Sequence, residues 1–166
     1  YSLGDKIMAG TISPEEYGTL IAKNYIFHVE MEHALEFFLK DLQEFHSRRK
    51  TQLLLKDISE LGIKNLPLKK FSAPPFTNRA EALGAMYVLE GATLGSAIIY
   101  RQLLKNREIS SKSSFHYYKG YGHETGTRWK VFLRILELEI QSESDKHNAV
   151  SGAVKTFQAF EELLKM

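Results

Sequence analysis

Apolar side chains recur at steps of three and four residues along most of the chain, which is the spacing of one face of an α-helix. The longest run follows Ser13, Pro14 and Glu16, where a serine N-cap, a proline at the first helical position and a glutamate at the capping-box position form a strong helix start. This run predicts a helix of about 30 residues. Its periodic positions are Tyr17, Leu20, Ile21, Asn24, Tyr25, His28, Met31, Leu35, Phe38, Leu42 and Phe45.

The same period predicts four more helices, separated by segments rich in proline or in Ser, Gly and Tyr. Gly62 is placed to end the first of them, because glycine readily adopts the left-handed conformation that terminates helices. No strand pair or internal repeat is evident, so the sequence predicts an all-α, bundle-like fold. The predicted helices are 51–61, 77–105, 127–141 and 146–166; the predicted connections are 63–76, with Pro67, Pro74 and Pro75, and 106–126, with at most one short helical turn.

A chain of 166 residues is long enough for one well-packed core and short for two. We therefore expect residues 1–166 to form a single domain. The first segment, YSLGDKIMAG, is typical of the end of a helix already under way. We expect the N-terminal part of that first helix to lie upstream of Tyr1.

Charge and composition narrow the classes of partner and chemistry. The formal net charge of +2 gives no global attraction to nucleic acid or to an anionic membrane, and no apolar run approaches the roughly 18 residues of a membrane span. The chain has no cysteine, which excludes disulfides, thiolate metal ligands and cysteine nucleophiles. A cytoplasmic protein that binds neither membrane nor nucleic acid is the simplest expectation.

The stretch LEGATLGSA, Leu89 to Ala97, places two glycines inside a predicted helix. Two helical glycines cost about 2 kcal/mol relative to alanine, so some other interaction must offset them. Small residues continue on both sides at helical spacing, which makes a smooth strip of backbone surface. The strip serves either close packing between helices or contact with a flat ligand, and spacing favours the first without deciding. Its members are Gly84, Ala85, Val88, Gly91, Ala92, Gly95 and Ser96.

The residues around this strip carry a family resemblance. LGAMYVLEGATLGSAIIYRQL, residues 83–103, resembles the distal helix of heme oxygenases, and most closely the bacterial, biliverdin-producing branch associated with bacteriophytochromes. GYGHETGTRWKVFLRILELE, residues 120–139, is similar to the family's glycine-rich turn and the helix after it. The first 35 residues also follow the family's first loop and second helix. The resemblance therefore covers nearly the whole chain.

The resemblance implies a heme-oxygenase-like multi-helical bundle that cleaves heme to biliverdin and releases iron and CO. Heme is then both substrate and cofactor, and electrons come from a partner such as a ferredoxin or a flavoprotein reductase. Gly91 and Gly95 correspond to the distal glycines that let the helix backbone lie over the porphyrin, and Ser96 stands where mammalian members have a further glycine. Ala92 replaces the aspartate that anchors distal waters in mammalian members.

Further site residues follow from the same resemblance. Lys130 and Arg134, at i and i+4, match the family's basic positions for the heme propionates, although a solvated surface stripe has the same pattern. Tyr121 and Arg128 are weaker candidates in that neighbourhood. His28 aligns with a tyrosine of the distal water network, and is either a polar anchor or an ordinary helix residue at a wet edge. The proximal histidine that binds the iron is expected shortly upstream of Tyr1.

Other classes of protein remain open at this point. Glu30 and His33 form the Glu-x-x-His half-site of di-iron carboxylate bundles, but no other histidine has a glutamate three residues before it. The cysteine-dependent, thiaminase-like relatives of this architecture are excluded by the lack of cysteine. A non-catalytic helical protein, such as a heme sensor, a heme carrier or a dimerisation module, would keep the small-residue strip for packing alone.

Overall fold

A computed structural model describes residues 2–66 and 71–166, and all regular structure in these ranges is helical. The all-α prediction is therefore confirmed. Pro67 lies outside the described residues, whereas Pro74 and Pro75 lie in an irregular stretch, as predicted. The helices are α1 (Leu3–Ala9), α2 (Pro14–Leu39), α3 (Gln43–His46), α4 (Thr51–Glu60), α5 (Arg79–Gly91), α6 (Thr93–Lys105), α7 (Arg107–Ser110), α8 (His116–Lys119), the 3-10 turn η1 (Gly122–Glu124), α9 (Thr125–Glu139) and α10 (Glu143–Lys165).

Side-chain caps fix where the long helices begin. At α2, the Ser13 hydroxyl accepts the Glu16 amide at 3.1 Å and the Glu16 carboxylate accepts the Ser13 amide at 3.0 Å, so the predicted capping box is confirmed. Asn78 caps α5 by accepting the Glu81 amide at 2.9 Å. Each cap satisfies an amide that has no partner inside its helix.

The helix that starts at Pro14 ends earlier than its apolar pattern predicts. α2 stops at Leu39, and the chain turns before the short helix α3. Two side chains take carbonyl groups at this end: Arg79 donates to the Phe38 carbonyl at 2.8 Å, and His46 Nε2 bonds to the Lys40 carbonyl at 2.7 Å. The apolar periodicity of the sequence extends past the end of α2 because Leu42 and Phe45, after the turn, pack on the same core as α2.

The connection 106–126 also holds more structure than predicted. It contains α7, α8 and η1 rather than a single turn. Phe115, at the start of α8, has a φ of 54°, which a phenylalanine rarely adopts, and its buried ring packs edge-on against Tyr17. Burial of this ring holds a backbone conformation that local sequence does not favour.

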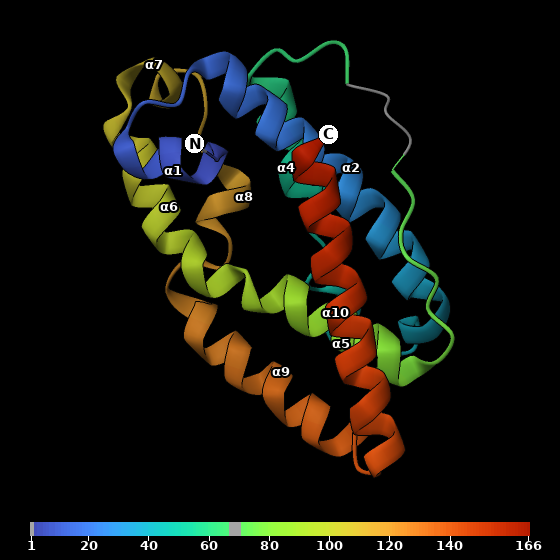
Figure 1. The fold of residues 1–166 in the computed structure, drawn as a ribbon. Coiled ribbons are helices and arrows are strands. Elements are labelled where there is room, and N and C mark those ends of the chain that lie inside the picture. Colours follow the sequence, from blue (N-terminus) through green and yellow to red (C-terminus); the bar gives the residue numbers. More distant parts are fainter. Residues whose placement is uncertain (1, 67–70) are drawn as a thin grey trace.

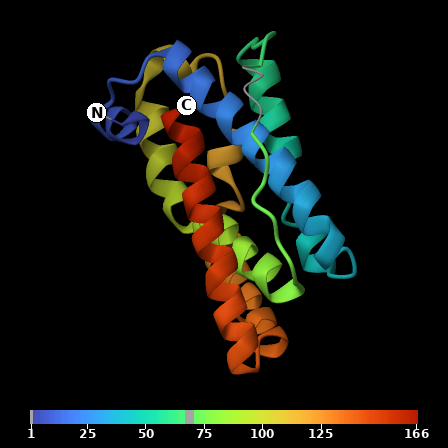
Figure 2. The ribbon, with the colours of Figure 1, turned by 45° about the vertical axis from the view of Figure 1, so that its right-hand side comes forward.

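Two apolar clusters form the core. The first joins the second half of α2 to α5, α9 and α10, and the second joins α1 and the first half of α2 to α4, α6, α7 and α8. In Figure 1, α10 crosses in front of α5, the helix it contacts most extensively. Figure 2 shows α2 and α4 side by side. Lys23 donates to the Leu164 carbonyl at 3.2 Å, so the end of α10 returns to α2.

The predicted helix 77–105 is divided in two. α5 ends at Gly91 and α6 starts at Thr93, and Figure 1 shows the two meeting at an angle. The Thr93 hydroxyl donates to the Glu90 carbonyl at 2.6 Å, and the Gly95 amide bonds to the Ala92 carbonyl at 3.3 Å, three residues back instead of four. The helix therefore tightens and bends at Ala92.

Together, residues 79–105 meet the length and composition criteria for a membrane-spanning helix, with a mean hydropathy of 1.5 in an 18-residue window. This finding corrects the expectation that no segment comes close to those criteria. The core helix of a soluble protein meets them equally well, and α5 is buried along most of its length against α10. Packing inside the bundle therefore accounts for the apolar character of α5 but not for that of α6, in which only Thr93 and Leu103 are buried.

Candidate functional site

The small-residue strip serves packing at one end and lies open at the other. A Cβ atom added to Gly84 would fall 1.8 Å from the Ala149 carbonyl oxygen of α10, so this glycine is required for close contact between the two helices. A Cβ at Gly91 would lie 3.6 Å from the Trp129 ring, an ordinary contact. A Cβ at Gly95 would meet no atom within 4 Å among the described residues, apart from its chain neighbours and the backbone of its own helix. The packing interpretation is therefore confirmed at Gly84, whereas packing does not explain Gly95.

The bend separates a buried helix from an exposed one. α5 is mostly buried, whereas only Thr93 and Leu103 are buried in α6. Apolar side chains nevertheless face outward along this surface, since Leu94 and Ile98 are 48% and 49% exposed. Gly95 lies between them and leaves the backbone bare. This part of α6 is an uncovered apolar surface that a flat ligand can approach closely.

The apolar surface continues from α6 to Tyr87, one helical turn before Gly91. Tyr87 is 42% exposed and its ring lies 5.3 Å from that of Trp129. It also lines a groove of about 460 Å³ between α5, α9 and α10, whose other walls are mostly aliphatic. Ligand pockets typically fall between roughly 300 and 1,000 Å³. The groove has the volume of a ligand pocket, but it lies along α5 before the bend, and no residue of α6 lines it.

A buried ion cluster lies just before the bend. Glu90 is 2% exposed, and its carboxylate accepts hydrogen bonds from Arg48 at 2.7 Å, from Lys50 at 3.0 Å and from the Tyr121 hydroxyl at 2.9 Å. Burial lowers the pKa of Lys50, and the negative charge of Glu90 opposes that effect. Burial together with the nearby Glu90 carboxylate raises the pKa of Tyr121. The phenol therefore stays protonated and donates to the carboxylate.

Three members of this cluster, Arg48, Lys50 and Glu90, were not predicted from the sequence. The first two belong to the run HSRRK, which has the composition of a solvated charged turn. Their burial depends on contacts with residues about 40 positions away, which no local pattern reveals. The available signal was Glu90 itself, a charged residue within an otherwise apolar helical stretch.

The predicted basic residues differ in their contacts: Arg128 interacts with other side chains, whereas Lys130 and Arg134 form no ion pair within the described ranges. Arg128 donates to the Ser47 hydroxyl at 3.0 Å and lies over the Tyr121 ring at 4.2 Å. Lys130 and Arg134 are exposed on α9, and within the described ranges neither forms an ion pair. Tyr121 and Arg128 thus belong to the surroundings of Glu90, since Tyr121 bonds to Glu90 and Arg128 lies over the Tyr121 ring, whereas Lys130 and Arg134 remain available to an anionic group.

His28 is not at a wet edge, which corrects one of its two interpretations. It is 3% exposed, its Nε2 lies 3.1 Å from the Tyr117 hydroxyl, and its buried Nδ1 has no hydrogen-bond partner among the described residues. Burial and the nearby Lys50 charge lower its pKa to about 3, so the ring is neutral. A cavity of about 20 Å³ beside His28, Glu32 and Glu90 has room for one water molecule.

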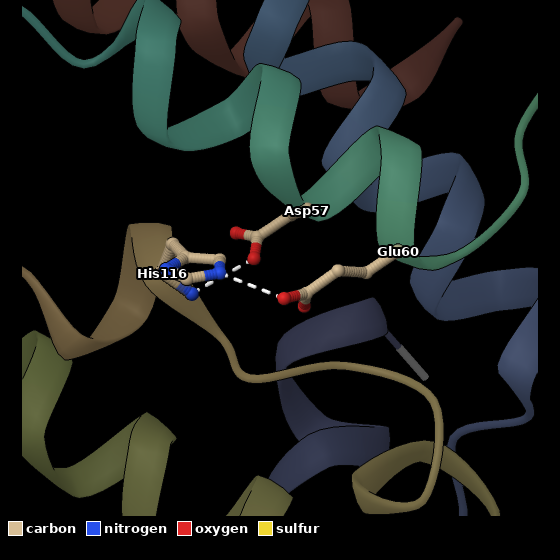
Figure 3. Close-up of side chains that lie close together, drawn as sticks. All are labelled: Asp57, Glu60 and His116. Atoms are coloured by element: carbon tan, nitrogen blue, oxygen red, sulfur yellow. Dashed lines mark hydrogen bonds and ion pairs between the residues drawn. The ribbon is translucent and has the colours of Figure 1, made fainter.

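A group of potential metal ligands lies between α4 and α8. Figure 3 shows Asp57 and Glu60 of α4 close to His116 of α8, with ligand atoms within 4.8 Å of one another. All four carboxylate oxygens already accept hydrogen bonds: Asp57 accepts the His116 and Tyr117 amides at 2.8 and 2.9 Å, and Glu60 accepts the Ser114 amide and His116 Nε2 at 2.7 and 2.8 Å. This arrangement caps the start of α8 and is explained without a metal.

The di-iron alternative requires a second group of metal ligands close to Glu30 and His33. Within residues 2–66 and 71–166, the Asp57 group is the only one that brings three such ligand atoms together. Glu30 and His33 are not part of any such group, and His33 is exposed. A Glu-x-x-His half-site without a second half cannot hold two metal ions. The described structure therefore gives the di-iron interpretation no support.

The chain matches known proteins in both sequence and fold. Residues 2–166 match the sequence profile of the Heme oxygenase family. The chain is 28% identical over 153 residues to a heme oxygenase of Xanthomonas campestris, covering 91% of this chain and 90% of that one. It is 24% identical over 155 residues to the heme oxygenase PigA of Pseudomonas aeruginosa, covering 92% and 78%.

The fold agrees as well. The structure superposes on the NO- and CO-bound heme oxygenase of Neisseria meningitidis with a TM-score of 0.79 at 20% identity, covering 99% of this chain and 83% of that one. The profile match spans the apolar surface of α6, the ion cluster and the exposed cations of α9 in one alignment. This chain belongs to the heme oxygenase family.

Proposed function

We propose that this protein binds heme against the exposed surface of α6 and cleaves it oxidatively to biliverdin, with release of iron and CO. The observation that carries the proposal is Gly95, whose Cβ position is empty to 4 Å in the middle of an apolar helical surface. Glycine is costly in a helix, and here no packing contact requires it. A flat molecule lying on the backbone does require it.

The residues on this surface fit a porphyrin. Leu94 and Ile98 are large, apolar and about half exposed, so covering them with an aromatic macrocycle removes apolar area from water. Gly91 and Gly95 lower the surface between them, and Trp129 borders it at Gly91. When bound, heme would supply the iron at which dioxygen is reduced for attack on the porphyrin edge.

The chain's own contribution on this side of the heme is to present no acid or base. Ala92 and Gly95 have no polar side chain, and the Ser96 hydroxyl donates to the Ala92 carbonyl at 3.3 Å, back onto its own helix. A surface of backbone and small side chains leaves space for ordered water near the reacting centre. Protons can then arrive through solvent while the helix excludes bulky groups that would redirect the oxidation.

Charged groups complete the proposed site. Lys130 and Arg134 are exposed and unpaired within the described residues, so they are available to the two heme propionates. The expectation that residues 1–10 are the end of a longer helix is wrong, because Ser2 caps α1: its hydroxyl accepts the Asp5 amide at 3.1 Å, and the Asp5 carboxylate accepts the Ser2 amide at 3.0 Å. The proposal therefore assigns the iron ligand to none of the described helices. Electrons would come from a ferredoxin or a flavoprotein reductase that docks where the heme edge is exposed. A protein of this kind works in the cytoplasm and needs neither membrane nor nucleic acid.

The test uses the full-length gene product with hemin. The expected result is saturable binding with a sharp Soret band, followed by appearance of biliverdin absorbance when a reductant and oxygen are added. Detection of CO in the gas phase confirms ring cleavage at a bridging carbon. Saturable binding without biliverdin would replace the enzyme with a heme carrier or sensor. No binding by a folded protein would refute the heme site itself.

A further inference from the structure

Glu90 connects the bend between α5 and α6 to three distant parts of the chain. Its carboxylate accepts Arg48 and Lys50 from the segment before α4, and the Tyr121 hydroxyl from the turn before α9. Arg48 extends the connection, because it also donates to the Arg128 carbonyl of α9 at 2.8 Å. The residue next to Glu90 is Gly91, the first glycine of the proposed heme surface.

The cluster is buried and its charges are balanced locally. The side chains of Arg48, Lys50 and Glu90 are 2%, 5% and 3% exposed in their ion pairs. Glu32, also buried, accepts the Lys50 amide at 2.6 Å and the Thr51 hydroxyl at 2.6 Å, and Glu44 pairs with Arg48 at 2.7 Å. Removing one charge from such a cluster leaves its partner buried and uncompensated, which is strongly destabilising.

The backbone of Glu90 is held at the same point as its side chain. Its carbonyl accepts the Thr93 hydroxyl at 2.6 Å, within the tightened turn that ends α5. The Trp129 ring lies beside Gly91, 3.6 Å from where a Cβ atom would be, and 6.0 Å from the ring of buried Phe132. The ion cluster therefore fixes the last turn of α5 relative to α9 immediately before the helix changes direction.

We infer that Glu90 is a positioning residue that sets the angle between α5 and α6 through its buried pairs with Arg48, Lys50 and Tyr121. The angle determines where Gly95 and its apolar neighbours lie relative to the cations of α9. The bend itself is a property of the heme-free protein, whereas its consequence for heme rests on the proposed function.

Trp129 reports on this angle without any heme. It is the only tryptophan in the chain, and its ring lies beside Gly91, next to Glu90, and 5.3 Å from the Tyr87 ring of the same helix. The test variant is Glu90→Gln, and the matched control variant is Glu81→Gln. Glu81 is also a buried carboxylate of α5 paired with a lysine, Lys155 at 2.9 Å, but it faces α10 far from the bend.

In the heme-free protein, Glu90→Gln is expected to shift the tryptophan emission to the red and to increase its quenching by acrylamide, because the contact at Gly91 loosens. Glu81→Gln is expected to leave both unchanged. The double variant Glu90→Gln/Lys50→Met is expected to return the emission toward that of the wild type, since neither partner is then charged while Arg48 keeps Glu44 and the Arg128 carbonyl.

A folded Glu90→Gln protein with wild-type emission overturns the inference. So does an equal shift in Glu81→Gln, which indicates general loosening, or a double variant no closer to wild type than the single one. If Glu90→Gln does not fold, Tyr121→Phe removes one hydroxyl from the cluster and should give a smaller shift in the same direction. Unchanged emission in that variant then counts against the inference.

A second readout connects the angle to heme. If wild-type protein binds hemin, Glu90→Gln should bind it about tenfold more weakly and with an altered high-spin to low-spin ratio, while Glu81→Gln binds normally. If wild-type protein binds no hemin, the proposed function fails, but the tryptophan experiment still tests the positioning role. The two failures are therefore distinguishable.

Discussion

Gly84 of α5 and Gly152 of α10 each make room for the backbone of the other helix. A Cβ atom on Gly84 would fall 1.8 Å from the Ala149 carbonyl oxygen, and one on Gly152 would fall 1.9 Å from the Glu81 carbonyl oxygen. Backbone atoms cannot move aside as a flexible side chain can. The two glycines therefore determine how closely the most extensive helix pair of the molecule packs.

Alanine at either position is expected to destabilise the protein by about 3 kcal/mol, because α5 and α10 must separate to accept the methyl group. The measurement is urea unfolding followed by circular dichroism. Gly18→Ala is the control: Gly18 lies inside α2, and its added Cβ would make only an ordinary 3.5 Å contact with Ile63. That variant should gain about 0.5–1 kcal/mol from helix propensity. Equal effects at all three glycines would contradict the close-packing explanation.

These contacts show what the sequence could and could not reveal about the fold. Helix starts were predictable where a side chain within the next turn defines them, as at Ser13 and Asn78. The division at Ala92 was not, because the apolar period runs through it unchanged and the causes are tertiary: a buried pair at Glu90 and a tryptophan at Gly91.

In the candidate site, too, some features could be predicted from the sequence and others depend on tertiary contacts. Spacing identified Gly84, Gly91 and Gly95 as one strip but could not tell that the first packs against backbone and the last lies in open space. The family resemblance pointed to the same surface, since it compares whole environments rather than single residues. Arg48 and Lys50 were missed because the run around them is polar, and only the fold brings them to Glu90.

Substitution at Gly95 should separate ligand binding from folding. Because nothing lies within 4 Å of its Cβ position, Gly95→Ala and Gly95→Leu should fold as stably as the wild type, or more stably by up to about 1 kcal/mol. Hemin affinity should fall progressively with side-chain size, to no detectable binding for leucine. Hemin titration and thermal unfolding of the same samples give the two readouts. Loss of stability in Gly95→Leu would instead indicate that this face packs within the protein.

His28 should make the protein less stable below neutral pH. Its pKa of about 3 in the folded state is below the ordinary value of 6.5, so the unfolded chain binds the proton first as pH falls. The contribution of neutral His28 is complete above pH 6.5 and is lost on descent from 6.5 toward 3, at about 1.4 kcal/mol per pH unit.

The measurement is the free energy of unfolding in urea between pH 7.5 and 4.5 for the wild type and for His28→Gln. Glutamine keeps a polar group of similar length but does not titrate, so the difference between the two proteins should shrink steadily below pH 6.5. His33→Gln, at an exposed position of the same helix, should track the wild type. Parallel curves for wild type and His28→Gln would show that this histidine is not held neutral by burial.

Removal of the free cations of α9 should weaken heme binding without affecting the fold. Lys130 and Arg134 are exposed, so Lys130→Ala and Arg134→Ala should unfold at the wild-type temperature. An exposed ion pair contributes up to about 1 kcal/mol, so each change should raise the hemin dissociation constant by about fivefold at low salt. Screening should reduce that difference at high salt, because the pairs face solvent. Lys119→Ala, at the exposed last residue of α8, is the charge-matched control and should bind hemin like the wild type at both salt concentrations. Equal weakening in all three variants would reflect the loss of overall positive charge, and would remove the propionate role from Lys130 and Arg134.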